Sequence, residues 1–321
     1  MIGALALLFG AALLAIVAPA VLRKLLEVRT DPQVVLVVWA VLVGATFLTT
    51  VGTLVIIVLP THGPMLLLMR FAHNYANFDH GSFPIHELSG ALLLIPVAVV
   101  STLACRGLVR YTREQRRLHR RHLDLLRITA SPETGSLTTM WLPASEPLAY
   151  SVAGTPSLVV ATRGVREQLR SGDIAAVLEH ERAHLRGRHH VLVGLAQALA
   201  NSAPWVPLMR HSPSLVRAAV ELAADRVAAR SHGATAVRTA LLTLTKHRGG
   251  PSAPANSLSM GEGNVGLRLS HLETSTLGSS PAKRALTSSI AALATTVVLT
   301  VAGTGLLFAA VTLFAGLPFA G

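Results

Sequence analysis

Four long apolar stretches constrain this chain more than any other feature of its sequence. They cover residues 2–22, 34–59, 88–108 and 289–319. A helix needs about 20 consecutive apolar residues to cross the hydrocarbon core of a bilayer, and each stretch reaches that length. The chain is 51% hydrophobic and only 14% charged, with a mean hydropathy of +0.53, which is more apolar than a typical soluble domain. We therefore predict a membrane protein with four transmembrane helices.

The position of the basic residues predicts how these helices are oriented. Loops that face the cytoplasm are enriched in Lys and Arg. Basic residues follow the first and third stretches and precede the fourth. The loop of residues 61–87, in contrast, has a single basic residue, Arg70. We expect a multi-pass protein of the cell membrane with both termini outside and residues 109–285 in the cytoplasm. Because Arg23 and Lys24 follow the first stretch and no basic residue precedes it, we expect a retained helix and not a cleaved signal peptide.

The net charge of +12 does not indicate a nucleic-acid-binding protein. Such a protein would spread its charge over one recognition face, whereas here the basic residues cluster beside the apolar stretches. The arginine-rich run of residues 106–121 is therefore expected to contact acidic lipid of the bilayer. The single cysteine, Cys105, excludes an intramolecular disulfide framework.

The sequence HERAH at residues 180–184 is the candidate for chemistry. On a helix, residues four apart lie on one face, so His180 and His184 can bind one metal ion while Glu181 points toward an attacking water. Catalytic zinc needs a third protein ligand and an open fourth position. The motif is short, and the chain has 14 histidines, so the motif alone does not decide the matter.

A second pair, Glu221 and Asp225, supplies what the first motif lacks. These carboxylates are again four residues apart, in a chain that has only 16 acidic residues. Glu221 can complete a His-His-Glu zinc site, and Asp225 can accept a hydrogen bond from a ligand histidine and fix its tautomer. The alternative is that both acids lie on a solvated face near Arg217, Arg226 and Arg230. We expect the other histidines, including His189 and His190, at the surface or behind the metal ligands.

Local patterns place these motifs in an α+β domain. Residues 149–152 and 157–161 are β-prone runs around Gly154-Thr155-Pro156, which predicts a hairpin. The helix with HERAH is expected to begin near Ser171-Gly172-Asp173 and to end at Gly187. A helix through residues 192–203 should break near Pro204 and Pro207, and the helix with Glu221 should open at Ser212-Pro213-Ser214. Residues 247–264 have the composition of an exposed loop.

The combination of HERAH and ELAAD resembles the gluzincin metallopeptidases of membranes, and in particular the BlaR/MecR-type integral membrane metallopeptidases. AYSVAG and LVVAT upstream and VGLRLSHL downstream carry the resemblance further. It implies three transmembrane helices in residues 1–108, a cytoplasmic gluzincin-like zinc domain in residues 109–285, and a fourth helix in residues 286–321. Relatives that sense β-lactams continue into an extracellular penicillin-binding domain, whereas this chain ends at Gly321, so we expect the form without that sensor.

The resemblance also implies a mechanism and a substrate. Zn²⁺ would be held by His180, His184 and Glu221, and Glu181 would act as the general base. An extended peptide would pair with an edge strand, for which residues 157–162 are the candidate. The leading interpretation is a bacterial, signal-transducing endopeptidase that cleaves a cytoplasmic protein such as a transcriptional repressor, or itself, in residues 247–264. The alternatives are a quality-control or prenyl-protein-processing peptidase and a non-enzymatic scaffold with a structural zinc.

Overall fold

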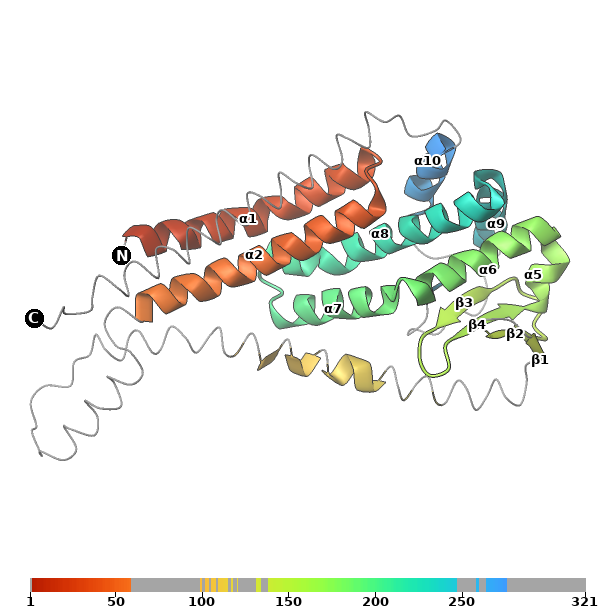
Figure 1. The fold of residues 1–321 in the computed structure, drawn as a ribbon, viewed down its shortest axis with the longest axis horizontal. Helices are drawn as coiled ribbons and strands as arrows, with labels where there is room; N and C mark the ends of the chain where they lie inside the picture. The colour runs from red at the N-terminus through yellow and green to blue at the C-terminus, as the bar shows by residue number, and fades with distance from the viewer. Residues whose placement is uncertain are drawn as a thin grey trace, which may run out of the picture.

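The computed structural model describes residues 2–58, individual helical residues between 99 and 120, and residues 131–133, 138–246, 258–259 and 264–275. The predicted fourth transmembrane stretch, residues 289–319, lies outside the described residues, as does nearly all of the predicted loop at 247–264. The third stretch, residues 88–108, is described at a few helical positions only. The described part is mainly helical with one small sheet (Figure 1).

Two long helices open the chain. Helix α1 (Ile2–Glu27) and helix α2 (Pro32–Val58) lie side by side and are joined by a short turn. Within them, Leu8–Glu27 and Pro32–Thr50 are long and apolar enough to cross a membrane. Three threonines of α2, Thr46, Thr50 and Thr53, bond back to the preceding turn, as where Thr46 Oγ1 donates to the Leu42 carbonyl at 2.8 Å. Their hydroxyls are therefore satisfied within an apolar helix.

The sheet has five strands in the order β1-β2-β4-β3-β5. The predicted hairpin is confirmed, because β3 and β4 pair antiparallel around the turn at 153–157. Strand β4 also pairs in parallel with β2 on its other side. The strands are β1 (Ser131–Glu133), β2 (Thr138–Leu142), β3 (Ala149–Val152), β4 (Leu158–Thr162) and β5 (Leu258–Ser259).

The prediction that residues 157–162 form a free edge strand is wrong. β4 lies between two neighbours, and all five of its residues are buried. A continuous apolar run such as LVVAT is typical of a strand covered on both faces. The sequence did not predict β2, the strand that pairs with β4 on its other side. Without this partner, residues 157–162 were expected at the edge of the sheet. In the described part of the chain β3 lies outside β4, and the short strand β5 pairs with it.

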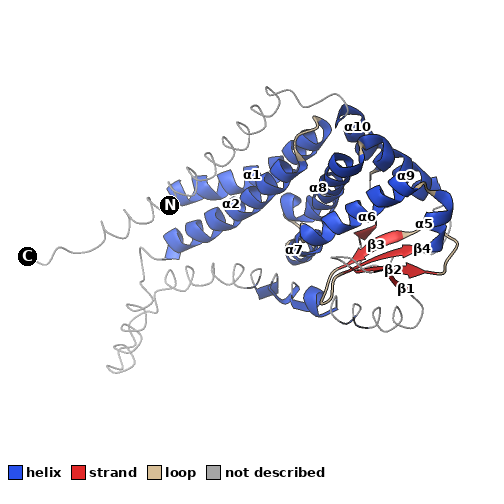
Figure 2. Ribbon diagram, turned by 45° about the vertical axis from the view of Figure 1, so that its right-hand side comes forward, coloured by secondary structure: helices blue, strands red, loops and turns tan. Residues whose placement is uncertain are grey.

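The part of the chain that the structure describes from residue 163 onward contains six further helices. They are α5 (Arg163–Gln168), α6 (Ser171–Arg186), α7 (His189–Ser202), α8 (Pro207–His232), α9 (Ala234–Lys246) and α10 (Val265–Ser275). Helix α6 crosses the sheet against β3 (Figure 2), and it packs on α8 and α9. As predicted, α6 ends before Gly187, and α8 ends before Gly233, whose φ of 85° favours glycine.

Helix α8 begins earlier than its sequence predicts. It starts at Pro207 and continues through Pro213, whereas the expected start was at Ser212-Pro213-Ser214. The Ser212 hydroxyl donates to the Leu208 carbonyl at 2.7 Å and accepts from Trp39 Nε1 at 2.8 Å. Packing of Leu208 and Leu215 in the core shared with α1 and α2 stabilises the first turns. Tertiary contacts here outweigh the local preference of proline.

Contacts from the turn between α1 and α2 join the two long helices to the rest of the chain. Asp31 forms an ion pair with Arg226 on α8. His271 on α10 donates from Nε2 to the Leu26 carbonyl at 2.8 Å. Both contacts lie next to the residues that build the candidate site described below, so the helical hairpin and the site are parts of one packed structure.

Gly164 offers a test of how the sheet meets α5. A Cβ on Gly164 would lie 2.1 Å from the Ser145 carbonyl oxygen, and backbone atoms cannot move aside as a flexible side chain can. We expect Gly164→Ala to destabilise the protein by about 1–3 kcal/mol or more, measured by thermal unfolding of the detergent-solubilised chain. The control is Gly172→Ala, since a Cβ there meets nothing within 4 Å. Equal unfolding temperatures for the two variants would contradict this packing.

Candidate metal centre

Helix α6 brings His180, Glu181 and His184 together inside the protein. The helix begins at Ser171, and the predicted role of Ser171-Gly172-Asp173 as N-cap is shifted by one position, since the N-cap is Arg170. Its side chain donates from Nε to Asp173 Oδ2 at 3.0 Å. All three motif residues are buried, with His180 and Glu181 at 0% exposure and His184 at 1%. The α6 spacing therefore turns the two imidazoles and the carboxylate into the interior.

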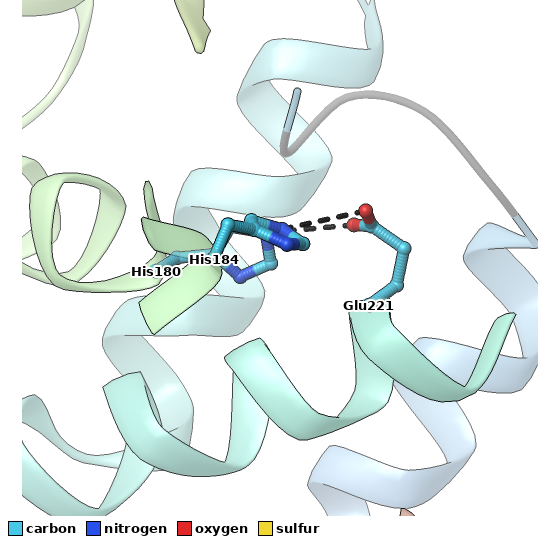
Figure 3. Close-up of side chains that lie close together, drawn as sticks. All are labelled: His180, His184 and Glu221. Carbon is cyan, nitrogen blue, oxygen red and sulfur yellow. Dashed lines mark hydrogen bonds and ion pairs between the residues drawn. The ribbon is translucent and has the colours of Figure 1, made fainter. Parts of the chain in front are cut away.

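Glu221 on α8 faces the two histidines across the interface of α6 and α8. Its Oε2 lies 3.4 Å from His180 Nε2, and its Oε1 lies 3.4 Å from His184 Nε2. The two Nε2 atoms are 3.1 Å apart. Figure 3 shows both imidazoles directed at the carboxylate. The structure therefore brings Glu221 next to the two histidines of the HERAH motif.

These three side chains fit a zinc ion. Zinc binds His nitrogen and carboxylate oxygen at about 2.0–2.2 Å with tetrahedral geometry, which places neighbouring donor atoms about 3.3 Å apart. The separations of 3.1 and 3.4 Å agree with this value. Two imidazole nitrogens and a carboxylate are also the donor set that zinc prefers. Among the described residues, His180, His184 and Glu221 form the one group with the spacing of metal ligands.

Asp225, one turn after Glu221, lies behind His180. Its Oδ1 is 3.0 Å from His180 Nδ1, on the side of the ring opposite to the Nε2 that faces Glu221. A carboxylate at this position favours the tautomer with a proton on Nδ1 and leaves Nε2 with its lone pair for a metal. Asp225 is itself only 2% exposed.

Arg268 on α10 completes the cluster, and the sequence did not predict it. Its Nε and Nη2 donate to Asp225 Oδ2 and Oδ1 at 2.7 and 2.6 Å, and its Nη1 lies 3.0 Å from Glu221 Oε2. The side chain is 1% exposed. One guanidinium thus pairs with both carboxylates of α8. The stretch VGLRLSHL contributes to the family resemblance. Its sequence alone, however, does not indicate that its arginine pairs with Asp225 and Glu221.

The charges of the cluster favour a divalent cation. Glu181, Glu221 and Asp225 are three buried carboxylates, and Arg268 is the buried cation among them. Burial alone would raise the pKa of Asp225, but Arg268 and His180 outweigh it and hold that pKa below its usual range. Burial would lower the pKa of His180, but Asp225 and Glu221 outweigh it and raise it to about 9. The site therefore attracts positive charge.

His189, the first residue of α7, lies behind His184. Its Nδ1 is 2.9 Å from His184 Nδ1, and the side chain is 7% exposed. Burial, with the nearby charges of His180 and His190, lowers the pKa of His189 to about 4. A neutral imidazole can accept the Nδ1–H of His184, which leaves His184 Nε2 for a metal. Of the two locations expected for His189, at the surface or behind the candidate metal ligands, the structure has the second.

Gly187 makes this position of His189 possible. A Cβ on Gly187 would lie 2.4 Å from His189 Nε2, so a larger residue would displace the ring. Arg188, between the two, adopts a left-handed conformation with φ 49°, which turns the chain sharply from α6 into α7. The segment RGRHH thus has a structural role that its composition alone did not show.

Comparison with known proteins identifies a family for this arrangement. The sequence profile of peptidase family M48 matches residues 112–284, which is more than half of the chain and includes every residue of the cluster. Searches among curated proteins and among solved structures found no significant match.

Replacing Arg268 tests whether its guanidinium holds the cluster together. In Arg268→Gln the carboxylates of Asp225 and Glu221 lose their buried counter-ion, so we expect a loss of about 3–5 kcal/mol in the free energy of unfolding of the metal-free protein. The control is Arg238→Gln, which removes an exposed pair with Glu273 at 3.7 Å and should cost less than about 1 kcal/mol. A stability equal to that of the control would show that the buried pair contributes nothing.

Replacing His189 tests its contact with His184. Loss of a group that orients a metal ligand weakens metal binding by about 10–100-fold, and we expect that range for His189→Ala in a zinc competition titration. His190→Ala, at the next position, should bind zinc as the unaltered protein does. The assignment would be wrong if both variants had the same affinity, or if His189→Gln, which keeps an acceptor, restored nothing.

Proposed function

This chain belongs to peptidase family M48, and on that premise we propose that it is an integral membrane zinc endopeptidase that hydrolyses peptide bonds of a cytoplasmic protein. One observation carries the proposal. Two histidines and a glutamate converge at metal-binding distances, and a further glutamate stands on the same turn of α6. A structural zinc site is closed by four protein ligands, whereas three are found among the described residues.

Each residue of the cluster has a different role in the proposed hydrolysis. His180, His184 and Glu221 would hold the metal, which when bound supplies Lewis-acid chemistry that polarises a carbonyl group and activates water. Glu181 accepts the proton of the attacking water and delivers it to the leaving amine. Asp225 and His189 keep the two imidazoles in the tautomers that present Nε2, and Arg268 balances the charge of the two α8 carboxylates.

The membrane location and the regulatory role extend this proposal. The apolar character of α1 and α2 supports a membrane protein, and the arginines around residues 106–121 support a cytoplasmic peptidase domain. The resemblance to BlaR/MecR-type proteins supports a substrate such as a transcriptional repressor, or the chain itself. In this assignment, the bilayer and one protein substrate are the partners, and nucleic acid is not contacted directly.

Glu181→Gln separates the enzyme from a non-enzymatic scaffold. Removal of a general base lowers the rate of hydrolysis by about 10²–10⁴-fold, while zinc binding should persist because the three ligands remain. The measurement compares the cell's proteome with unaltered protein and with the variant, since substrates accumulate uncut in the variant. Glu179→Gln is the matched control, because Glu179 lies on the same helix and pairs with Arg186 outside the cluster.

The proteins that accumulate distinguish the kinds of peptidase. Accumulation of one soluble regulator would support the proposed signalling role. Accumulation of many unfolded membrane proteins would instead indicate quality control, and accumulation of prenylated precursors would indicate maturation. If neither the proteome nor the protein's own cleavage pattern changed, peptidase activity would be excluded.

A further inference from the structure

The turn between α7 and α8 is apolar and partly exposed. Residues 203–209 read Ala-Pro-Trp-Val-Pro-Leu-Met and contain no charged side chain. Leu208 and Met209 are buried in the protein, but Trp205 is 67% exposed. A single exposed apolar residue on a soluble surface needs no explanation. Trp205 does need an explanation, because it lies close to the apolar helices α1 and α2.

The turn lies beside the membrane helices and not beyond their ends. Trp39 in α2 donates to Ser212 at 2.8 Å, and the first half of α8 packs on both α1 and α2 in a shared core. Figure 1 shows the beginning of α8 running alongside α2. The turn that joins α7 to α8 therefore reaches back along the segment of α2 that is apolar enough to cross a membrane.

Contacts of residues 107 and 111, at the end of the third apolar stretch and just after it, also indicate where the α7–α8 turn lies. A Cβ on Gly107 would lie 3.7 Å from Ala198 Cβ, and a Cβ on Gly194 would meet the ring of Tyr111. Gly107 thus lies against Ala198, and Tyr111 lies against Gly194. The helical residues around 107–111 therefore run antiparallel to α7. The described positions just before 107, which are 102, 103, 105 and 106, consequently lie toward the end of α7 and the turn.

Exposed arginines lie on three elements that contact α7 or α8 or form part of α8, and we call them the basic belt. Burial and the positive charges of Arg23 and Arg210 lower the pKa of His211, which places the end of α1 close to the start of α8. Arg106 adjoins Gly107, the residue that contacts α7. The belt consists of Arg23, Arg106 and Arg210.

The belt and the turn lie close enough together to share one membrane interface. Trp205 stands five positions before Arg210, in the turn just ahead of α8, and the helical part from Pro207 to Arg210 rises about 4.5 Å at 1.5 Å per residue. Interfacial segments bury their apolar side about 5–10 Å deep at the boundary of headgroups and acyl chains. Tryptophan is enriched at this depth, and arginines pair with anionic headgroups.

We propose that the α7–α8 turn inserts into the bilayer, with Trp205 as its anchor and the basic belt on the anionic headgroups. The inference rests on the proposed membrane location and is independent of the peptidase chemistry. Helices α1 and α2 also expose large apolar residues, among them Phe9, Ile16, Val37 and Phe47. The lipid bilayer is thus the partner of a part of the peptidase domain, in addition to the transmembrane helices.

Tryptophan fluorescence in vesicles tests the proposal. The chain has three tryptophans, so Trp39→Phe with Trp141→Phe leaves Trp205 as the sole reporter in the full chain. In vesicles of phosphatidylcholine and phosphatidylglycerol, we expect brominated lipid to quench its emission several-fold. Acrylamide in the water should quench it weakly. The matched control keeps Trp141, which lies on β2 beneath Arg166 and should respond in the opposite way.

Each outcome bears on the inference. Trp205 quenched by acrylamide and not by brominated lipid would overturn it, and protection from both quenchers would also overturn it, since protein would then cover the turn. Because Trp39→Phe removes a hydrogen bond, the difference in quenching between the unaltered chain and Trp205→Phe provides a second measurement. Extraction of the chain from vesicles by carbonate would refute the proposed membrane location itself, whereas Glu181→Gln reports on peptidase activity alone.

Discussion

The pairing of Arg268 with Asp225 and Glu221 is the interaction on which the site depends. The carboxylates of Glu221 and Asp225 are buried within a few ångströms of the imidazoles of His180 and His184, and burial of so much negative charge is costly without a counter-ion. The guanidinium suits this task because its planar fork donates to both oxygens of Asp225 and still reaches Glu221. It also ties α10 to α8, so an element far along the chain closes the site.

The parts of the site that the sequence predicted are those encoded by local spacing. His180 with His184 and Glu221 with Asp225 each lie one helical turn apart, so a helix alone brings each pair to one face. Arg268 lies 43 positions after Asp225, and no periodicity connects them. His189 depends on a left-handed Arg188 and on the absence of a side chain at Gly187, which are properties of a turn and not of a motif.

The same division holds for the fold. The β3–β4 hairpin and the ends of α6 and α8 follow from turn and cap residues near in sequence. The position of β4 inside the sheet depends on β2, a strand whose pairing with β4 is a long-range contact. The early start of α8 depends on Trp39, 173 positions away. Where a neighbour distant in sequence decides the structure, local patterns predict the wrong edge or the wrong first residue.

Helix α8 carries both Arg210 of the basic belt and Glu221 of the metal centre. The eleven steps from Arg210 to Glu221 correspond to about 16 Å of helix, and an extended peptide spans that distance with about five residues at 3.3 Å each. A helix is a rigid spacer, so this separation is fixed by the fold. With the belt on the headgroups, as proposed, α8 would hold Glu221 at the distance of one rigid helical segment from the lipid surface.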